Sequence, residues 1–559
     1  MHPVHGRPPD EPSAALADPP ELMRTGTDAG PLTGSHTPGV AQEAGRRRTF
    51  AIISHPDAGK STLTEKLLLY GGAVDRAGTI RRRAGRRATT SDWMEMEQRR
   101  GISIASTVAP FEHRGHRLNL VDTPGHADFS EDTYRVLTAV DAGLMVLDAA
   151  KGVEERTLRL FEVCRDRGLP LVTFVNKLDR PSLSPLAILD DIERRIGIRP
   201  TPATWPVGNG PDLVGVVDRA TDRLVEFDRV PGGSTKAAER VHPVPYDSDD
   251  ATIRSAAEEV RLLDAEDVHV DPESFREGAS TPVFFGSALW SYGIGQLLDA
   301  IVDLCPAPAP AIDMTGVPRA IDAPFAGTVF KVQANTDPRH RDRLAFIRVA
   351  SGVFRRGDAL TVASSGRRFV ANHVHEIFGR DRSTLDEAYP GDILALSNAR
   401  DLGLGDTLFA AEPVVFPPIP RFAPELFRVA RNQDSRRAKR FRRGLEYLDQ
   451  EGTIQVLRLE EHGDREPLLG AVGGMQFDVV VDRLQAEFQV DIDLVPSELK
   501  AVRITDRPGA LALRNVRRIT IVERSDGAVF ALAPSESWFD GVRRDHPDIR
   551  LEDPHTTDE

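Results

Sequence analysis

The sequence predicts an α/β first domain, built on a doubly wound, mostly parallel sheet with an insertion, followed by a β-barrel domain and an α+β domain. Three observations predict this order. The 559 residues exceed what one hydrophobic core normally supports. Short apolar runs alternate with helical patterns through the first half, which is typical of parallel strands joined by helices. After a proline-rich stretch, short alternating strands are separated by glycine-containing turns, which favours a small barrel.

The apolar runs of the first half are short and uninterrupted, as buried parallel strands are. The segments between them have helical periodicity, so strands and helices alternate as in a doubly wound sheet. The predicted strands are 50–53, 118–121, 144–147, 171–175 and 283–285, and the predicted helices are 61–70, 154–167 and 294–304.

Composition changes along the chain predict the domain limits. Residues 1–45 are rich in Pro, Gly, Ala and Asp, which predicts a disordered tail. The first domain is expected to span 46–312, with an insertion at about 198–280 that contains a helix at 253–264. The barrel is expected at 322–413 and the α+β domain at 420–559, with helices near 425–448 and 477–488, a strand at 453–457 and a weak pattern after Val502.

Composition and charge exclude several classes of protein. No apolar stretch approaches the roughly 18 residues that a membrane span needs. Two cysteines, Cys164 and Cys305, exclude a disulfide framework and favour the cytoplasm. The net charge of −14 argues against a protein uniformly coated for nucleic acid. Basic clusters at 81–83 and 436–443 leave open either a local RNA contact or an ordinary solvated face.

A phosphate-binding loop is predicted between the first strand and the first helix, where backbone N–H groups can bind phosphate. Gly59 allows close approach of the backbone, Lys60 is expected against the β- and γ-phosphates, and the Ser61 hydroxyl is expected to ligate Mg²⁺. Because the usual first glycine is serine here, this motif alone is equally compatible with a turn or a helix cap. The loop consists of Ser54, His55, Pro56, Asp57, Ala58, Gly59, Lys60 and Ser61.

A second motif ends the strand at 118–121. Asp122 can reach the Mg²⁺ shell through water, and Gly125 can offer its amide to a γ-phosphate. The alternative is an ordinary turn at the end of a strand. The motif consists of Asp122, Thr123, Pro124, Gly125 and His126.

A third motif ends the strand at 171–175 and predicts recognition of guanine. An amide there would face the base edge, and a carboxylate would lie opposite its N1–H and exocyclic amine, so adenine should bind poorly. A fourth segment, after the strand at 283–285, is expected to supply backbone amides for the base. These residues are Asn176, Lys177, Leu178 and Asp179, with Ser287, Ala288 and Leu289. Four motifs in order predict GTP and GDP as ligands.

A polar stretch at 91–103 lies between the first two motifs and is interpreted as a switch. Ser103 would close over the γ-phosphate and Mg²⁺ and would release after hydrolysis. A plain surface loop is the alternative interpretation.

These motifs resemble those of the translational GTPases, and the run 91–97 resembles the peptide chain release factor 3 family of bacteria. The resemblance covers roughly residues 46–500. It is carried by 205–208, 281–289, 330–347, 389–392, 422–427 and 470–480. The N-terminal tail, the basic segment at 81–87 and the stretch after Val502 depart from the family pattern, but no nucleotide-site residue is missing.

The resemblance implies that His126 positions the attacking water and that Pro56 and Ile102 flank it as a hydrophobic gate. A histidine without a role in a glycine turn is the alternative. It also implies ribosome-stimulated GTP hydrolysis that promotes departure of a codon-reading release factor after peptide release. The implied partners are the ribosome and those release factors, and the chain is expected to be a monomer away from the ribosome.

Two other functions stay open from the residues. One is a translocase or ribosome-protection GTPase of the elongation factor G type, although only one domain's length follows the barrel. The other is a GTP-dependent ribosome-binding regulator whose hydrolysis is incidental, against which His126 argues.

Overall fold

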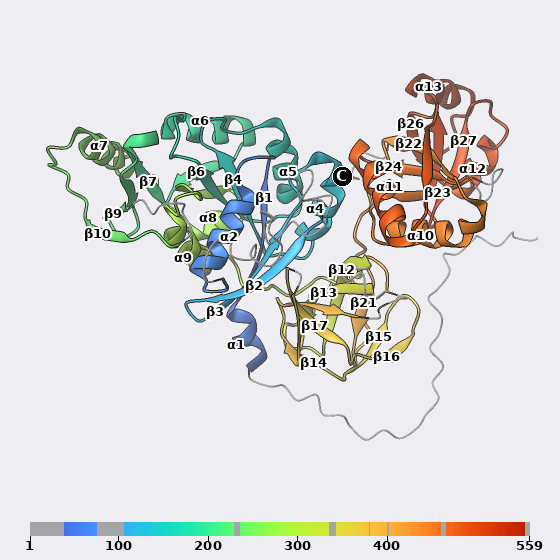
Figure 1. Cartoon of the computed structure of the whole chain (residues 1–559), viewed down its shortest axis with the longest axis horizontal. Helices are drawn as coiled ribbons and strands as arrows, with labels where there is room; N and C mark the ends of the chain where they lie inside the picture. Colours follow the sequence, from blue (N-terminus) through green and yellow to red (C-terminus); the bar gives the residue numbers. More distant parts are fainter. Residues whose placement is uncertain are drawn as a thin grey trace, which may run out of the picture. The chain divides into compact units, whose positions relative to one another are not determined.

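The computed structural model describes residues 39–74, 105–228, 235–334, 343–379, 381–397, 399, 402–459 and 466–553 (Figure 1). The basic residues 81–83 and the predicted switch at 91–103 lie outside the described residues, as does the predicted tail up to residue 38. Among the described helices, none is long and apolar enough to cross a membrane.

The first domain is built on a seven-stranded sheet with the order β2-β3-β1-β4-β5-β11-β6. All neighbouring strands are parallel except β2 and β3, which confirms the predicted mostly parallel sheet. The strands are β1 Arg47–Ser54, β2 Thr107–His113, β3 His116–Asp122, β4 Ala142–Asp148, β5 Leu171–Asn176, β6 Arg199–Pro202 and β11 Ser280–Phe285.

Helices cover both faces of this sheet (Figure 1). Successive side chains of a strand point to opposite faces, so Phe50 and Ile52 join one core and Ala51 and Ile53 join the other. The first core includes α2 Lys60–Tyr70 and α9 Ile294–Leu304, and the second includes α4 Ser130–Leu137, α5 Glu155–Asp166 and α6 Pro185–Ile196. The 3-10 turn η2 Ala127–Phe129 precedes α4.

A short helix, α1 Gly39–Gly45, lies within the segment for which the sequence predicts a disordered tail. Its Val40 and Ala44 are buried. Glu43 forms ion pairs with Arg46 and Arg47, and the hydrogen bond from Arg47 holds the pKa of Glu43 below its usual range. Burial of Val40 and Ala44, together with these local ion pairs, therefore accompanies a helix in a segment whose composition alone favours disorder.

The predicted insertion at 198–280 begins within the main sheet, since β6 pairs with β11. A separate antiparallel sheet then follows in the order β10-β9-β8-β7, and the predicted helix at 253–264 corresponds to α7. The elements are β7 Thr204–Val207, η3 Gly210–Asp212, β8 Gly215–Asp218, β9 Arg223–Phe227, β10 Glu239–Pro243, α7 Ala251–Ala265 and α8 Pro272–Arg276.

The second domain is an antiparallel half-barrel of eight strands in the order β16-β15-β21-β12-β13-β20-β17-β18, beside the short pair β14–β19. Its core includes Val329, Ile347, Leu360 and Leu394. The strands are β12 Ala326–Ala334, β13 Arg343–Ser351, β14 Phe354–Arg355, β15 Ala359–Val362, β16 Arg368–Val370, β17 Val374–Phe378, β18 Asp381–Thr384, β19 Glu387–Ala388, β20 Ile393–Leu396 and β21 Thr407–Phe409.

A turn of the half-barrel packs on the strand that leads into the predicted phosphate loop. Arg47 of β1 donates from Nε to Asp392 Oδ2 at 2.9 Å, and both side chains are buried. The hydroxyl of Thr49 donates to the Gly391 carbonyl at 2.7 Å. A buried, hydrogen-bonded ion pair of this kind favours one relative register of the two domains.

The third domain mixes helices with a seven-stranded antiparallel sheet in the order β25-β22-β24-β23-β27-β28-β26. Its first elements are β22 Leu426–Asn432, η5 Ser435–Arg437, α10 Ala438–Gln450, β23 Gln455–Leu459, β24 Leu468–Ala471 and α11 Gly474–Phe488. The remaining ones are β25 Ile492–Pro496, β26 Ala501–Thr505, α12 Arg507–Leu513, β27 Thr520–Arg524, β28 Val529–Ala533 and α13 Glu536–Asp545.

One expectation for this domain is wrong, and one stretch holds more regular structure than its sequence pattern indicates. The helix predicted near 425–448 begins with a strand instead, because β22 pairs on both sides, with β24 and β25. The weak pattern after Val502 conceals regular structure, since β26 and β27 both pair with β28 in the same sheet. In both places strand pairing with distant residues outweighs local propensity.

Candidate functional site

The predicted phosphate loop lies between β1 and α2, at the carboxyl edge of the parallel sheet. Asp57 and Gly59 have positive φ angles of 66° and 98°, and together they turn the chain sharply into the helix. The residue before α2 is Gly59, which has no side chain to cap the helix. The N–H groups of the first helical turn are therefore not used by a capping side chain. A helix N-terminus of this form favours an anion.

The other loop residues contribute backbone and packing. The Ser54 hydroxyl donates to the His55 carbonyl at 2.9 Å, and Ala58 is fully buried. His55 Nε2 lies 2.5 Å from Glu154 Oε2. Burial lowers the pKa of His55, against the opposing charge of Glu154. The His55 side chain thus lies against Glu154, and the loop's expected contact with a phosphate is through its backbone.

Gly59 is the position where the loop tolerates no side chain. A Cβ there would lie 2.3 Å from Asn176 Nδ2. We expect Gly59→Ala to abolish nucleotide binding, because the loop must move away from Asn176. Gly72→Ala is the control, since Gly72 also has positive φ but a Cβ there meets nothing within 4 Å. That control should lose about 1 kcal/mol of unfolding free energy and keep its affinity for GDP. Equal affinities for GDP in a fluorescence titration would contradict the assignment.

The structure brings the second motif against the phosphate loop. Lys60 Nζ donates to Asp122 Oδ1, and both side chains are less than a tenth exposed. The Thr123 hydroxyl donates to the Ile52 carbonyl of β1 at 2.7 Å. A Cβ on Gly125 would lie 3.9 Å from Lys60 Cε, so the Gly125 backbone lies beside the lysine stem. The carbonyl of Pro124 accepts from Thr133.

The predicted Mg²⁺ ligands include a hydroxyl, Ser61, in the first turn of α2 and a carboxylate, Asp122, paired with its neighbour Lys60. Hard oxygen ligands of this kind fit Mg²⁺, which usually keeps several waters and binds substrate phosphates. In the described part of the chain no three His, Cys, Asp or Glu side chains form a metal cage. Ser103, the third predicted ligand, lies outside the described residues.

Asn176 ties three loops together. Its Nδ2 donates to the Ala58 carbonyl at 2.8 Å, and its Oδ1 accepts from the N–H groups of Lys177 and Ala288, each at 2.8 Å. The side chain is nearly fully buried. The sequence predicts an amide facing the base, whereas in the structure one Nδ2 hydrogen and Oδ1 are used inside the protein. The amide of Ala288, predicted to serve the base, is used in the same way.

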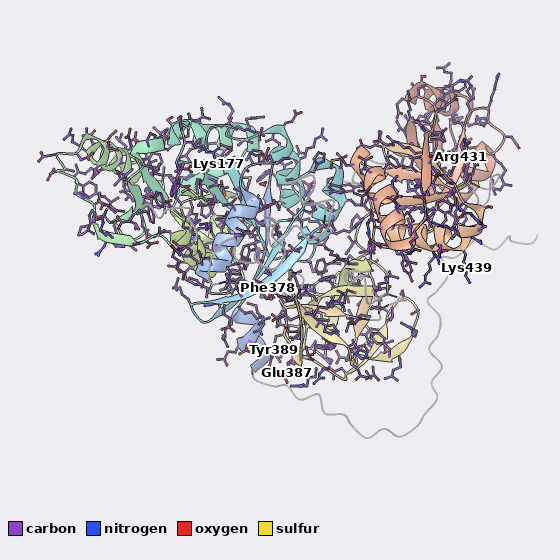
Figure 2. All side chains as sticks on the ribbon, in the orientation of Figure 1. Lys177, Phe378, Glu387, Tyr389, Arg431 and Lys439 are labelled. Atoms are coloured by element: carbon purple, nitrogen blue, oxygen red, sulfur yellow. The ribbon has the colours of Figure 1, made fainter. Side chains whose placement is uncertain are left out.

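Lys177, in the first domain, also connects to the phosphate loop (Figure 2). Its Nζ donates to the Asp57 carbonyl at 2.5 Å and to Asp148 Oδ2 at 2.8 Å. Burial alone would raise the pKa of Asp148, but the hydrogen bond from Lys177 holds it below its usual range. Lys177 is thus a fixed cation whose stem spans the two loops.

Asp179 is oriented by the fourth segment. Its Oδ1 accepts from the Ser287 hydroxyl at 2.5 Å, while the Leu178 N–H donates to the Gly286 carbonyl at 3.2 Å. Leu289 is 46% exposed and leaves this loop toward solvent. The carboxylate therefore has one oxygen fixed by Ser287, as a group aimed at one base edge requires.

His126 stands at the end of the second motif with its side chain one quarter exposed. Its Nδ1 lies 3.1 Å from Asp128 Oδ1, and its ring meets Phe129 edge-on with centroids 6.3 Å apart. Pro56 lies near Gly125, the residue before the histidine. Ile102, the other predicted gate residue, lies outside the described residues.

Sequence reasoning missed Asp148, Glu154 and Asp128. Asp148 ends β4, Glu154 precedes α5, and both meet the site only through the fold. Asp128 follows the second motif by two residues, so its spacing could have drawn attention to it. The roles of the predicted residues in nucleotide binding stay predictions.

Comparison with protein families covers all three domains. Residues 45–307 match the elongation factor Tu GTP binding domain, 324–411 match elongation factor G domain 2, and 416–542 match the class II release factor RF3 C-terminal domain. The last match extends past Val502, where the sequence suggests a weak resemblance. Together with the fold and the loop geometry, these matches define the class: the protein is a translational GTPase and binds guanine nucleotide.

Relatives are similar over most of the chain. Peptide chain release factor 3 of Gloeobacter violaceus is 48% identical over 82% of this chain and 87% of its own. Peptide chain release factor 3 of Bordetella pertussis is 48% identical over 84% of this chain and 89% of its own. That of a Cyanothece strain is 41% identical over 91% of this chain and 95% of its own. A crystal structure from Thermus thermophilus superposes with a TM-score of 0.66 at 27% identity, covering 82% of this chain and 69% of that one. The chain belongs to the peptide chain release factor 3 family.

Proposed function

We propose that this translation-termination GTPase is stimulated by the ribosome and promotes dissociation of codon-reading release factors after peptide release. The observation that supports it best is the convergence of four sequence motifs at one sheet edge, joined by Asn176 and by the Lys60–Asp122 pair. The proposal includes a monomer that acts in the cytoplasm.

Each end of the nucleotide has matching groups. The N-terminus of α2 and the ammonium of Lys60 would bind the phosphates, and Lys60 would exchange its bond to Asp122 for phosphate oxygens. Asp179, held by Ser287, would accept from the guanine N1–H and amine, and the second Nδ2 hydrogen of Asn176 stays available to the base edge. Mg²⁺ would be held by the hydroxyls of Ser61 and Ser103, with Asp122 bound through water, and would neutralise developing phosphate charge.

Hydrolysis needs an oriented water, and His126 is the group proposed to orient it. The Gly125 amide would bind the γ-phosphate next to Lys60. Because the ring of His126 is engaged with Asp128 and Phe129, the free protein should turn over slowly. An external partner that reorients the histidine would complete the site, as partners complete other slow GTPases.

The test is multiple-turnover GTP hydrolysis by the full chain with and without ribosomes. We expect an increase in kcat by a factor on the order of 10³ with ribosomes, within the range known for sites completed by a partner. Hydrolysis without ribosomal stimulation would favour the regulator with incidental hydrolysis. Stimulated hydrolysis together with movement of transfer RNA would favour the elongation factor G type, against which the C-terminal family match argues.

A further inference from the structure

The C-terminal domain begins its helix α11 against the residue that holds His126. Asp128 Oδ2 accepts a hydrogen bond from the Met475 N–H at 2.7 Å, while Asp128 Oδ1 lies 3.1 Å from His126 Nδ1. Met475 is the second residue of α11, where N–H groups have no partner within the helix and a carboxylate is favoured. One carboxylate therefore contacts both the candidate catalytic histidine and the C-terminal domain.

This contact is tight on the side of the C-terminal domain. A Cβ on Gly473 would lie 2.2 Å from Asp128 Cγ, whereas a Cβ on the next residue, Gly474, would meet nothing within 4 Å. Beside it, Phe129 packs with Val479, and both are buried. At position 473, therefore, only glycine leaves enough room for the Asp128 side chain.

A second contact fixes the helix that follows. Arg135 of α4 is buried in an ion pair with Glu131 and donates to the carbonyls of Glu451 and Gly452, at 3.3 and 3.4 Å. The segment 126–137 is therefore attached to the C-terminal domain at both ends. Separation of the two domains would remove both attachments, at Asp128 and at Arg135.

Among the described residues, the His126 ring contacts Asp128 and Phe129, which both touch the C-terminal domain. The Nδ1 atom of His126 lies 3.1 Å from Asp128 Oδ1, to which it donates when it carries a proton, and 3.3 Å from the Asp128 N–H, from which it accepts when it does not. The ring meets Phe129. We propose that Asp128 is a positioning residue: while α11 is docked on it, His126 is held away from the γ-phosphate of GTP, and undocking of α11 frees His126 to orient water. The inference rests on the proposed role of His126.

The first test uses the glycine pair. In the full chain, Gly473→Ala should raise the kcat of ribosome-independent GTP hydrolysis about tenfold, the size of one hydrogen bond to a charged group, with KM unchanged. Gly474→Ala is the matched control and should leave kcat as in the wild type. Asp128→Ala should raise kcat to a similar extent, and the double variant with Gly473→Ala should exceed neither single variant. A kcat of Gly473→Ala equal to that of Gly474→Ala, or multiplying effects in the double variant, would overturn the proposal.

A second pair of variants covers the case in which Gly473→Ala fails to fold. Met475→Pro removes the single N–H that Asp128 accepts, at a first-turn position where proline is tolerated. Met475→Ala keeps that N–H and loses the same apolar contact with Phe129. A higher kcat in Met475→Pro than in Met475→Ala supports the link, and equal values contradict it. Wild-type chain that hydrolyses no GTP even with ribosomes would instead refute the proposed function, so the two failures are distinguishable.

Discussion

Replacement of His126 by alanine will abolish ribosome-stimulated GTP hydrolysis while leaving nucleotide affinity nearly intact. The structure places His126 directly after the Gly125 backbone that lies beside Lys60, and its ring is positioned by Asp128 and Phe129. Loss of a group that orients the attacking water lowers kcat by a factor of roughly 10² to 10⁴. Binding should persist, because Lys60, Asn176 and Asp179 keep their partners.

The measurement is kcat with saturating ribosomes, together with the Kd for GDP from a fluorescence titration. His269→Ala is the control, since that side chain is 55% exposed and distant in sequence from every site motif. Wild-type kcat in His126→Ala would show that another group orients the water. A large rise in the Kd for GDP would show instead that His126 has a structural role in the loop.

The second large effect is expected from Asp179→Asn. The substitution replaces one acceptor oxygen by an N–H₂ group. That donor would face the N1–H and amine donors of guanine, so two hydrogen bonds are replaced by a donor–donor repulsion. We expect GTP affinity to fall by a factor of about 10² to 10³, since two hydrogen bonds to a carboxylate are lost. The bond from Ser287 can be retained by the Asn oxygen, so the fold of the loop should persist.

A xanthosine nucleotide gives this prediction a sharper control. Xanthine carries a carbonyl where guanine carries its exocyclic amine, so the variant amide should bind it better than the wild-type carboxylate does. Asp190→Asn, at an exposed position of α6, should leave both affinities unchanged. If Asp179→Asn bound GTP as tightly as the wild type, the assignment of the guanine-recognising carboxylate would be wrong.

Much of the first domain can be predicted from sequence, because its signals are local. A buried parallel strand is a continuous apolar run, so the run at 144–147 indicates β4, which begins two residues earlier and ends one residue later. The glycine-lysine-serine turn depends on backbone geometry that few residues permit, and Gly59 indeed has positive φ. These features need no knowledge of distant contacts.

Other features depend on residues far apart in the chain. The segment β22 is a strand because β24 and β25 flank it. The double use of Asn176 could not be predicted either, since its partner Ala58 is 118 residues away. The contact of Asp128 with Met475 spans 347 residues and has no local signal.

The most direct test of the central claim is a termination assay on ribosomes that have released their peptide and still hold a labelled codon-reading release factor. The full chain should speed dissociation of that factor in the presence of GTP, and His126→Ala should leave the chain bound afterwards because hydrolysis no longer releases it. GDP alone should not support the effect. Dissociation at the same rate with GTP, with GDP and without the protein would contradict the account.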